Sequence, residues 1–388
     1  MNRTFVYIIL CLLVVSKADA QYISGYGTDG SRQANIYTAV PFLLIMPHPR
    51  SGGMGNAGVA LSGDANSTAI NTAALAFLPT QHYGFSVNYS PWLKQLVPDM
   101  SISYLSGYYR LNERSTVSAS LRYFSIGNVS FSNENSQELG TYSPNESAFD
   151  IGYSLQLGPE FALGGNLRYI NSNLLGGGSI SSRSSGSGNA VAADISGLYR
   201  TEVALLGTNS SWSVGLSLSN IGTKLVYGNT GKSFFLPANF KMGSALQFGK
   251  EESRVTIALD LNKLMVPTQP IYDQQGNIIK GKDPERSVPS GIFGSFADAP
   301  GGFKEELKEV GISTGAEFSF KEKFFFRVGY CYQHPDKGNI SYLTTGLGFK
   351  YNVLSLDLSY LIGTPSNNPM ANTLRFGLQA NFGNTRQK

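Results

Sequence analysis

The stretch of sequence that decides the fold is Leu374-Arg375-Phe376-Gly377-Leu378-Gln379-Ala380-Asn381-Phe382. Apolar or aromatic residues occupy every second position, and polar residues or glycine stand between them. This alternation predicts a β-strand, because successive side chains of a strand point to opposite faces. A tilted strand of roughly nine to eleven residues is long enough to cross a membrane. We therefore expect one strand of a barrel wall that is apolar outside and polar inside.

The same pattern recurs from Tyr83 to Phe382 and predicts a fourteen-stranded antiparallel transmembrane barrel. The expected strands lie near residues 81–90, 101–110, 114–124, 146–157, 161–171, 190–200, 210–219, 238–249, 253–263, 309–319, 323–333, 340–350, 354–362 and 372–382. Short turns follow most even-numbered strands, and longer loops follow odd-numbered ones at 125–145, 172–189, 220–237 and 264–308. Outer-membrane barrels have short periplasmic turns and long extracellular loops, whereas a soluble sandwich, the alternative, has no reason to sort its connections. An even number of strands also predicts that both chain ends are periplasmic.

The composition agrees with a membrane barrel. The chain has 388 residues, only 14% of them charged, with 44 Gly, 21 Tyr and 23 Phe. Many aromatic residues are typical of barrels that carry aromatic girdles at both membrane interfaces. The net charge of +4 is small and the basic residues are scattered, which argues against a nucleic-acid partner. No run of eighteen apolar residues follows Ala20, so a membrane-embedded chain has to be a closed barrel in a Gram-negative outer membrane.

The first twenty residues predict a signal peptide. Arg3 supplies the positive charge, residues 6–15 form the apolar region, and Ala18-Asp19-Ala20 is a small-residue cleavage site. A membrane anchor, the alternative, needs a longer apolar run. Cleavage after Ala20 leaves Cys331 as the single cysteine, which excludes an internal disulfide. The expected organisation is a signal peptide (1–20), an N-terminal periplasmic hatch segment (21–80), the barrel (81–382) and a periplasmic tail (383–388).

Charged residues of both signs fall on the polar faces of the predicted strands and are expected in the lumen. They are Arg122, Asp150, Arg168, Asp194, Lys241, Asp260, Glu317, Arg327, Lys350, Asp357 and Arg375. An unpaired charge at this depth costs several kcal/mol, so these groups must be paired or hydrated. Two interpretations remain open: a network that rigidifies the wall, or a selective path for a polar solute.

The last strand also resembles the C-terminal signal that the outer-membrane insertion machinery reads. A polar residue is followed by Gly377 and by hydrophobic residues that end in the aromatic Phe382. In the usual signal the aromatic is the last residue, whereas here the short tail 383–388 follows it.

The segment before the wall does not alternate. Residues 51–58 are rich in glycine and small side chains, which predicts close packing. Residues 64–78 are expected to be helical, with Asp64 or Asn66 as the cap, and to lie inside the barrel as a plug. Phosphate binding by the glycine-rich run, the alternative, lacks the following Lys-Ser/Thr pair and a strand–turn–helix context.

Two resemblances add to this interpretation. The stretch Arg50 to Ala60, with Asn71-Thr72-Ala73, resembles the N-terminal signature of the FadL-like barrels, a fourteen-stranded group with an N-terminal hatch. Thr72 stands where that group usually has proline. Longer stretches resemble the PorV family, outer-membrane barrels of the type IX secretion system of Bacteroidetes. These stretches are 89–97, 104–110, 121–125, 167–170 and 295–308.

The PorV resemblance implies a role in protein export. It implies three partners: the secretion translocon barrel, cargo proteins with a conserved C-terminal domain, and the surface attachment complex that contains a sortase. It implies no cofactor, and outer-membrane lipid would surround the barrel. Barrels of the FadL-like group instead imply a channel for hydrophobic small molecules, which needs an apolar lumen pocket; the charged lumen counts against it.

The loop 264–308 is long enough to be functional, and it carries apolar residues. The candidate contact residues are Ile292, Phe293, Phe296 and Phe303 in this loop, and Trp92 after strand one. A short charged helix is expected after Pro300-Gly301-Gly302. Exposed aromatic residues in a loop suggest a partner surface, and a lid over the barrel mouth is the alternative. Trp92 has a second interpretation as an anchor at the membrane interface.

Catalysis and metal binding find little support. A hydrolase acting on lipid needs a histidine beside a serine, and the only histidines are His48, His82 and His334. None stands in an evident Ser/acid arrangement, so we expect no enzyme and no catalytic residue. One mature cysteine and unclustered histidines likewise predict no metal site.

Overall fold

The structure is a computed structural model that describes ten ranges of the chain. They are residues 36–78, 82–94, 97–132, 137–174, 187–205, 208–227, 232–250, 252–273, 275–363 and 370–383. The predicted signal peptide, its cleavage site and tail residues 384–388 lie outside these ranges.

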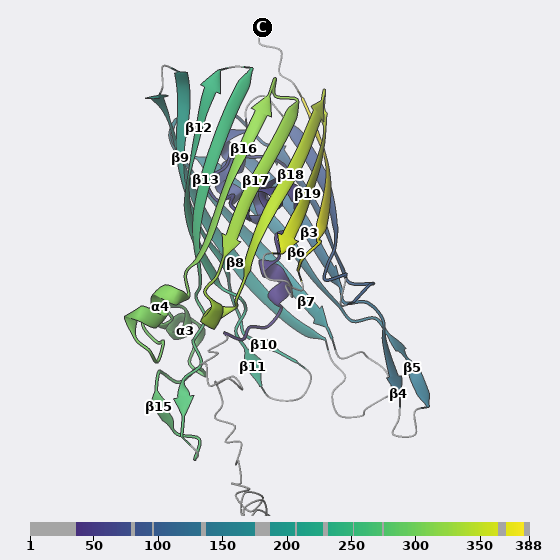
Figure 1. The fold of residues 1–388 in the computed structure, drawn as a ribbon, viewed down its shortest axis with the longest axis vertical. Coiled ribbons are helices and arrows are strands. Elements are labelled where there is room, and N and C mark those ends of the chain that lie inside the picture. The colour runs from purple at the N-terminus through teal and green to yellow at the C-terminus, as the bar shows by residue number, and fades with distance from the viewer. Residues whose placement is uncertain are drawn as a thin grey trace, which may run out of the picture.

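Fourteen antiparallel strands form a closed barrel, which confirms the predicted fold (Figure 1). The wall strands are β1 (Tyr83–Pro91), β2 (Ser101–Arg110), β3 (Ser115–Ser125), β6 (Asn145–Gln156), β7 (Phe161–Asn173), β8 (Gly188–Leu205), β9 (Thr208–Gly222), β12 (Asn239–Lys250), β13 (Ser253–Leu264), β16 (Gly311–Phe320), β17 (Phe324–Tyr332), β18 (Ser341–Tyr351), β19 (Leu354–Gly363) and β20 (Leu374–Phe382). β1 pairs with β2 on one side and with β20 on the other, which closes the wall. β8 and β9 extend well beyond their predicted ends and form the longest hairpin of the wall.

The two faces of the wall differ as the alternation predicts. In β1, Tyr83, Phe85 and Val87 are exposed on the outer face, whereas Ser86 and Asn88 are buried inside. An outer face of this kind is stable only against lipid, because in water it would expose a large apolar area.

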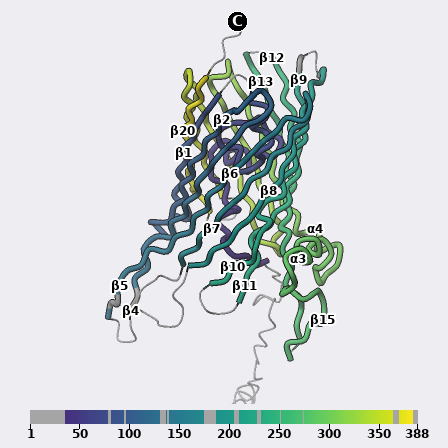
Figure 2. The backbone as a smooth tube through the Cα atoms, turned by 180° about the vertical axis from the view of Figure 1, so that it is seen from behind, coloured from purple at the N-terminus to yellow at the C-terminus, as the bar shows by residue number. Residues whose placement is uncertain are grey.

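The long loops are more ordered than expected, since three of them fold into two-stranded hairpins (Figure 2). The hairpins are β4 (Val129–Ser132) with β5 (Glu138–Tyr142), β10 (Leu225–Val226) with β11 (Ser233–Phe234), and β14 (Ile271–Tyr272) with β15 (Ile278–Lys280). The loop after β13 adds helices α3 (Val288–Gly294) and α4 (Phe303–Lys308), and η4 (Pro335–Lys337) follows β17. In these hairpins and helices the backbone N–H and C=O groups pair within the loop. The alternation of apolar and polar residues identifies only the wall strands, so it does not predict such pairing. All these elements lie at one end of the barrel, opposite the C-terminus, and we call this end the long-loop rim.

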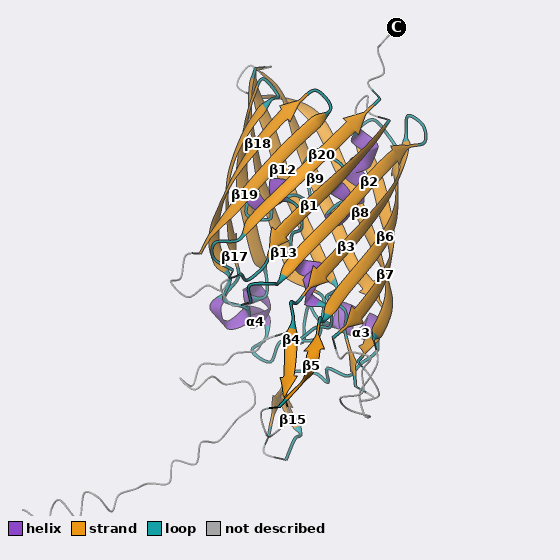
Figure 3. Ribbon diagram, turned by 90° about the vertical axis from the view of Figure 1, so that its right-hand side faces the viewer, coloured by secondary structure: helices purple, strands orange, loops and turns teal. Residues whose placement is uncertain are grey.

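A plug of short helical turns lies inside the barrel (Figure 3). Its elements are η1 (Pro41–Leu44), α2 (Pro49–Gly53), η2 (Ser67–Ala69) and η3 (Thr72–Phe77). The prediction of one helix over 64–78 is wrong in detail, because two 3-10 turns replace it. The side chain of Asn71, rather than Asp64 or Asn66, caps η3 by accepting the N–H of Ala73 at 3.0 Å. Within the described ranges, no helix is both long and apolar enough to cross a membrane.

Wall glycines let the backbone of the plug contact the backbone of the wall. A Cβ on Gly215 of β9 would lie 2.0 Å from the carbonyl oxygen of Val59. A Cβ on Gly329 of β17 would lie 2.1 Å from the nitrogen of Gly55. No side chain fits at either place, so these glycines determine how deep and how close the plug lies.

The chain enters the lumen from the long-loop rim. The N–H of Ala39 donates to the carbonyl of Phe235 at 2.9 Å, and the N–H of Val40 donates to the Tyr227 hydroxyl at 3.3 Å. The plug continues through the lumen to residue 78, and β1 starts at the other end, the turn rim, where Tyr83 pairs with Phe382 near the C-terminus. The expectation that the segment before the wall lies with the C-terminus is therefore wrong for its first described residues. An even number of strands determines only the end of the barrel at which β1 starts. It does not determine where the plug lies, and the plug extends along the lumen.

Candidate functional site

The structure places the eleven predicted lumen charges inside the barrel. Nine are buried: Arg122, Asp150, Arg168, Asp194, Asp260, Glu317, Arg327, Asp357 and Arg375. The other two are partly exposed to cavities in the lumen, Lys241 toward the long-loop rim and Lys350 toward the turn rim. The polar face of each strand therefore lies where the alternation puts it.

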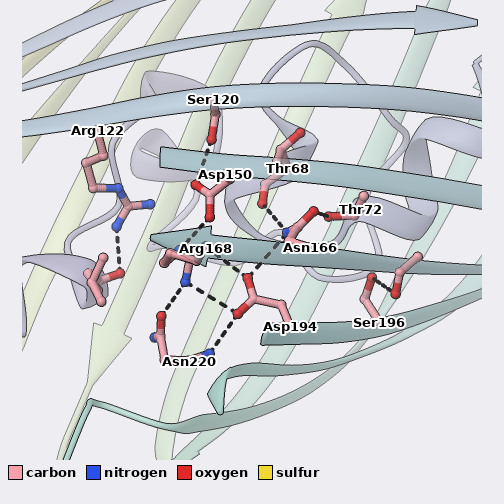
Figure 4. Close-up of polar contacts among 12 residues, drawn as sticks. Thr68, Thr72, Ser120, Arg122, Asp150, Asn166, Arg168, Asp194, Ser196 and Asn220 are labelled. Carbon is pink, nitrogen blue, oxygen red and sulfur yellow. Dashed lines mark hydrogen bonds and ion pairs between the residues drawn. The ribbon is translucent and has the colours of Figure 1, made fainter. Parts of the chain in front are cut away.

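One cluster is centred on Arg168 of β7 (Figure 4). Its Nε lies 2.5 Å from Asp150 on β6, and its Nη2 lies 2.9 Å from Asp194 on β8. Asp150 also accepts the hydroxyl of Ser120 at 2.8 Å, and Asp194 accepts the N–H of Asn220 at 2.7 Å. The two carboxylates and the guanidinium lie on three neighbouring strands, so the cluster links β6, β7 and β8 through their side chains.

A second cluster ties the plug to the wall. Arg327 of β17 lies between Glu317, at 2.7 Å, and Asp357, at 2.5 Å. Arg50 of the plug reaches the same Glu317 at 3.1 Å and also pairs with Asp64 of the plug at 3.2 Å. These charge-assisted bonds cross from plug to wall, a role that a count of wall strands cannot reveal.

Other lumen residues bind the backbone of the plug directly. Asp260 accepts the N–H groups of Gly58 and Val59 at 2.7 and 3.0 Å. Arg122 donates to the carbonyl of Leu43 at 2.6 Å, and Arg375 donates to that of Met46 at 3.2 Å. The predicted network therefore serves the plug as much as the wall.

A cavity of about 540 Å³ lies between the plug and the long-loop rim. Its polar side includes Arg122, Arg375 and Lys241. Its apolar side includes Leu43, Met46 and other residues of the plug and loops. The prediction of a charged lumen missed this apolar side, because the plug and the loops supply it, and neither shows strand alternation.

The loop after β13 is attached to the rim by buried ion pairs. The Nζ of Lys263 lies 2.9 Å from Glu306 and 2.5 Å from Glu309. The Nζ of Lys337 lies 2.7 Å from Glu305 and 2.9 Å from the same Glu309. The charged helix α4 agrees with the helix expected after Pro300-Gly301-Gly302, whereas its two lysine partners come from the end of β13 and from η4, which no local pattern indicates.

An outer ion pair adds to this attachment. The Nζ of Lys308 lies 2.6 Å from Asp336, and this hydrogen bond lowers the pKa of the Asp336 carboxyl below its usual range. Figures 1 and 2 show α3 and α4 at one side of the barrel mouth, below the end of β13.

The candidate contact residues separate into exposed and buried ones. Phe293 and Phe303 are 79% and 75% exposed, and Phe296 is exposed but packs one side against Phe240 of the rim. Ile292 is only 5% exposed and packs with Ala238 and Met265. We call Phe293, Phe296 and Phe303 the loop aromatics. Ile292 is wrong as a contact residue, because a short helix that exposes one face buries the other.

Trp92 is also wrong, both as a contact residue and as a membrane anchor. It is 9% exposed and belongs to an apolar cluster with Phe42 and Leu43 of the plug. The guanidinium of Arg375 lies 5.9 Å from its ring centroid. Trp92 follows the end of β1, and the plug covers it from inside, which strand alternation alone does not show.

The two residues of the predicted insertion signal have structural partners. A Cβ on Gly377 would lie 2.8 Å from Pro49, so this glycine makes room for the plug. The ring of Phe382 stacks on Tyr83 at 5.2 Å, across the closing seam of the barrel. Recognition of these residues by an insertion machinery stays a prediction.

Lys337→Met is expected to detach α4 from the rim. The change removes the ion pairs that Lys337 makes with Glu305 and Glu309, and Glu309 keeps its ion pair with Lys263. Breaking a buried pair by removing one partner costs about 3–5 kcal/mol. Limited proteolysis of the intact barrel should therefore cut within 265–310 much faster than in the unchanged protein. Lys280→Met, in the exposed β15 of the same loop, is the control, and equal cleavage rates would contradict the attachment.

The comparisons with known proteins agree with this geometry. The P. putida toluene transporter TodX has a TM-score of 0.51 at 13% identity, covering 87% of this chain and 98% of its own. The CymD monoaromatic hydrocarbon channel has a TM-score of 0.47 at 14% identity, covering 87% of this chain and 98% of its own. At these identities the likeness shows the fold alone. A search of curated proteins finds no match.

The fold defines the class: this is a closed fourteen-stranded antiparallel barrel with a plug inside, and it shares its fold with the toluene transporter TodX. The family model described as type IX secretion system protein PorV matches residues 28–271, more than half of the chain. The chain belongs to the PorV family, and it is an outer-membrane component of the type IX secretion system. Among the described residues, no group of three or more His, Cys, Asp or Glu side chains is placed to hold a metal ion.

Proposed function

We propose that this barrel binds the secretion translocon, receives cargo by its conserved C-terminal domain, and passes that cargo to the sortase-containing attachment complex at the cell surface. The loop aromatics, Phe293 on α3, Phe303 on α4 and Phe296 between the two helices, are the contact surface. Export to this location uses the predicted signal peptide, cleaved after Ala20. The observation that carries the proposal is the exposure of Phe293 and Phe303 on a loop that buried ion pairs hold in place.

Two physical arguments support this surface. Large aromatic side chains exposed outside the lipid-facing wall are characteristic of binding sites, because they contribute a large contact area when a partner covers them. The attachment through Lys263 and Lys337 holds the loop before a partner arrives. A loop that is already ordered loses less conformational entropy on binding, so more of the contact energy appears as affinity.

The double change Phe293→Ala and Phe303→Ala tests the proposal. Interface aromatics contribute about 2 kcal/mol or more each, so removing two should weaken partner binding at least tenfold. We expect the barrel to insert normally, while pull-down from membranes recovers less translocon and cargo, and less cargo reaches the cell surface.

The control is Phe326→Ala, which removes a 53% exposed aromatic side chain from the lipid-facing side of β17. It should leave export unchanged. Normal cargo display and normal recovery of partners from the double variant would show that the loop aromatics are not the contact surface.

A second function is supported by the cavity at the long-loop rim: passage of hydrophobic small molecules. Its volume of about 540 Å³ is in the usual range for sites of small ligands, and Leu43, Met46 and Trp92 give it an apolar side. Uptake of hydrophobic compounds and cargo export, both measured in cells that lack the barrel, distinguish the two functions. Loss of uptake of hydrophobic compounds with export intact would favour the channel, and the reverse pattern would favour secretion.

A further inference from the structure

Three cavities follow one another through the lumen. The cavity at the long-loop rim has a volume of about 540 Å³, and a second one of about 200 Å³ opens toward the turn rim beside Lys350 and Asn381. A small cavity of about 20 Å³ lies between them, large enough for one water molecule. It shares Ile70 with the first cavity, and it shares Arg50, Ser62 and Asp64 with the second.

At three glycines of the wall the backbone of the plug lies directly against the wall. A Cβ on Gly164 of β7 would lie 2.3 Å from the nitrogen of Ala73, and Gly215 and Gly329 are as close to the plug. Nothing the size of water passes between backbones at such distances. The row of cavities beside Arg50 is held by side chains instead.

Side-chain bonds of Arg50 close this row. Its Nη1 lies 3.2 Å from Asp64 and 3.0 Å from the carbonyl of Ser62, and its Nη2 lies 3.1 Å from Glu317 on the wall. These groups line both the small cavity and the cavity at the turn rim, except Glu317, which lines only the latter. A side chain that rotates away from its partners would join the two spaces, whereas a glycine contact cannot open without moving the plug.

We propose that the three cavities are one passage for water and small ions, and that Arg50 is the residue that closes it. The passage runs from the long-loop rim through the plug beside Arg50, and it reaches the turn rim between the plug and β16 to β20. A short stretch of chain connects the long-loop rim to Arg50. It is residues 39–48, which start at the backbone contact with Phe235 and lead directly to Pro49 and Arg50. Opening leaves the rest of the plug in place.

Conductance of the purified full barrel in planar bilayers tests the inference. The unchanged protein should stay closed. Arg50→Ala should increase the fraction of time that the passage is open by roughly tenfold or more. Hydrogen bonds to charged groups stabilise the closed state, and losing them shifts the equilibrium between closed and open states by about that factor. The opened passage should prefer K⁺ over Cl⁻, because Asp64 loses its ion pair within the described residues while Glu317 keeps Arg327.

Two further variants keep the test decisive. Asp64→Asn removes one partner of Arg50 with almost no change of shape, so it should also increase the open time. Arg254→Ala breaks an exposed ion pair with Glu322 at the turn rim and should leave the barrel closed. N-methylglucamine should fail to permeate Arg50→Ala, because the plug remains.

Three outcomes would overturn the inference. They are an unchanged protein that already conducts as Arg50→Ala does, folded Arg50→Ala and Asp64→Asn barrels no more conductive than Arg254→Ala, or free passage of N-methylglucamine. Cargo export measured on the same variants reports on the secretion role separately, since the inference depends on conductance alone.

Discussion

Gly215→Ala displaces the plug and lowers the free energy of unfolding of the barrel by about 1–3 kcal/mol, with a larger loss where the wall cannot move. The added methyl group would lie 2.0 Å from the Val59 carbonyl oxygen and 2.5 Å from its carbon. Both are backbone atoms, and the same oxygen accepts the side-chain amide of Asn71 at 2.6 Å. The plug therefore cannot yield by rotating a side chain and has to move as a whole.

Two measurements check this result. The midpoint of thermal unfolding in detergent should fall, and a protease added from outside should cut residues 49–78 of the variant but not of the unchanged protein. The control is Gly197→Ala, the same substitution on neighbouring β8, where no atom would lie nearer to the methyl group than the Leu163 side chain at 3.6 Å, an ordinary van der Waals contact. If both variants unfold at the same temperature and protect the plug equally, the backbone contact does not hold the plug.

Arg168→Met lowers the free energy of unfolding by about 3–5 kcal/mol, because it leaves two buried carboxylates without their cation. Asp150 and Asp194 each bond to Arg168, at 2.5 and 2.9 Å, and both are buried. Methionine fills part of the volume, so the expected loss comes from charge more than from packing. Denaturant unfolding in detergent, followed by the change in gel mobility of the folded barrel, measures it.

The controls separate charge from size. Arg254→Met removes an arginine from the exposed pair with Glu322 and should cost less than about 1 kcal/mol. Adding Asp150→Asn and Asp194→Asn to Arg168→Met removes the uncompensated charges and should recover part of the loss. A loss below about 1 kcal/mol for Arg168→Met, or no recovery in the triple variant, would show that the lumen is wet enough to solvate both carboxylates.

Much of the candidate site was predictable because it belongs to the wall. Alternation assigns Arg168, Arg327 and Asp357 to the inner face without knowledge of their partners, and the structure places them there. It cannot assign partners, since each ion pair joins separate strands or crosses to the plug. Trp92 and Ile292 show the same limit for the surface, because residues far away in the chain bury both.

The sequence by itself determined the barrel, its number of strands and the polar character of its inner face. Side-chain period and segment length are local properties, and a closed barrel is the one way for such strands to pair every backbone group in lipid. Only the tertiary structure decided that the first described residues lie at the long-loop rim, that Arg50 joins the plug to Glu317 of the wall, and that two lysines hold the loop of Phe293 and Phe303. Those features depend on contacts between distant segments, whose geometry no local pattern contains.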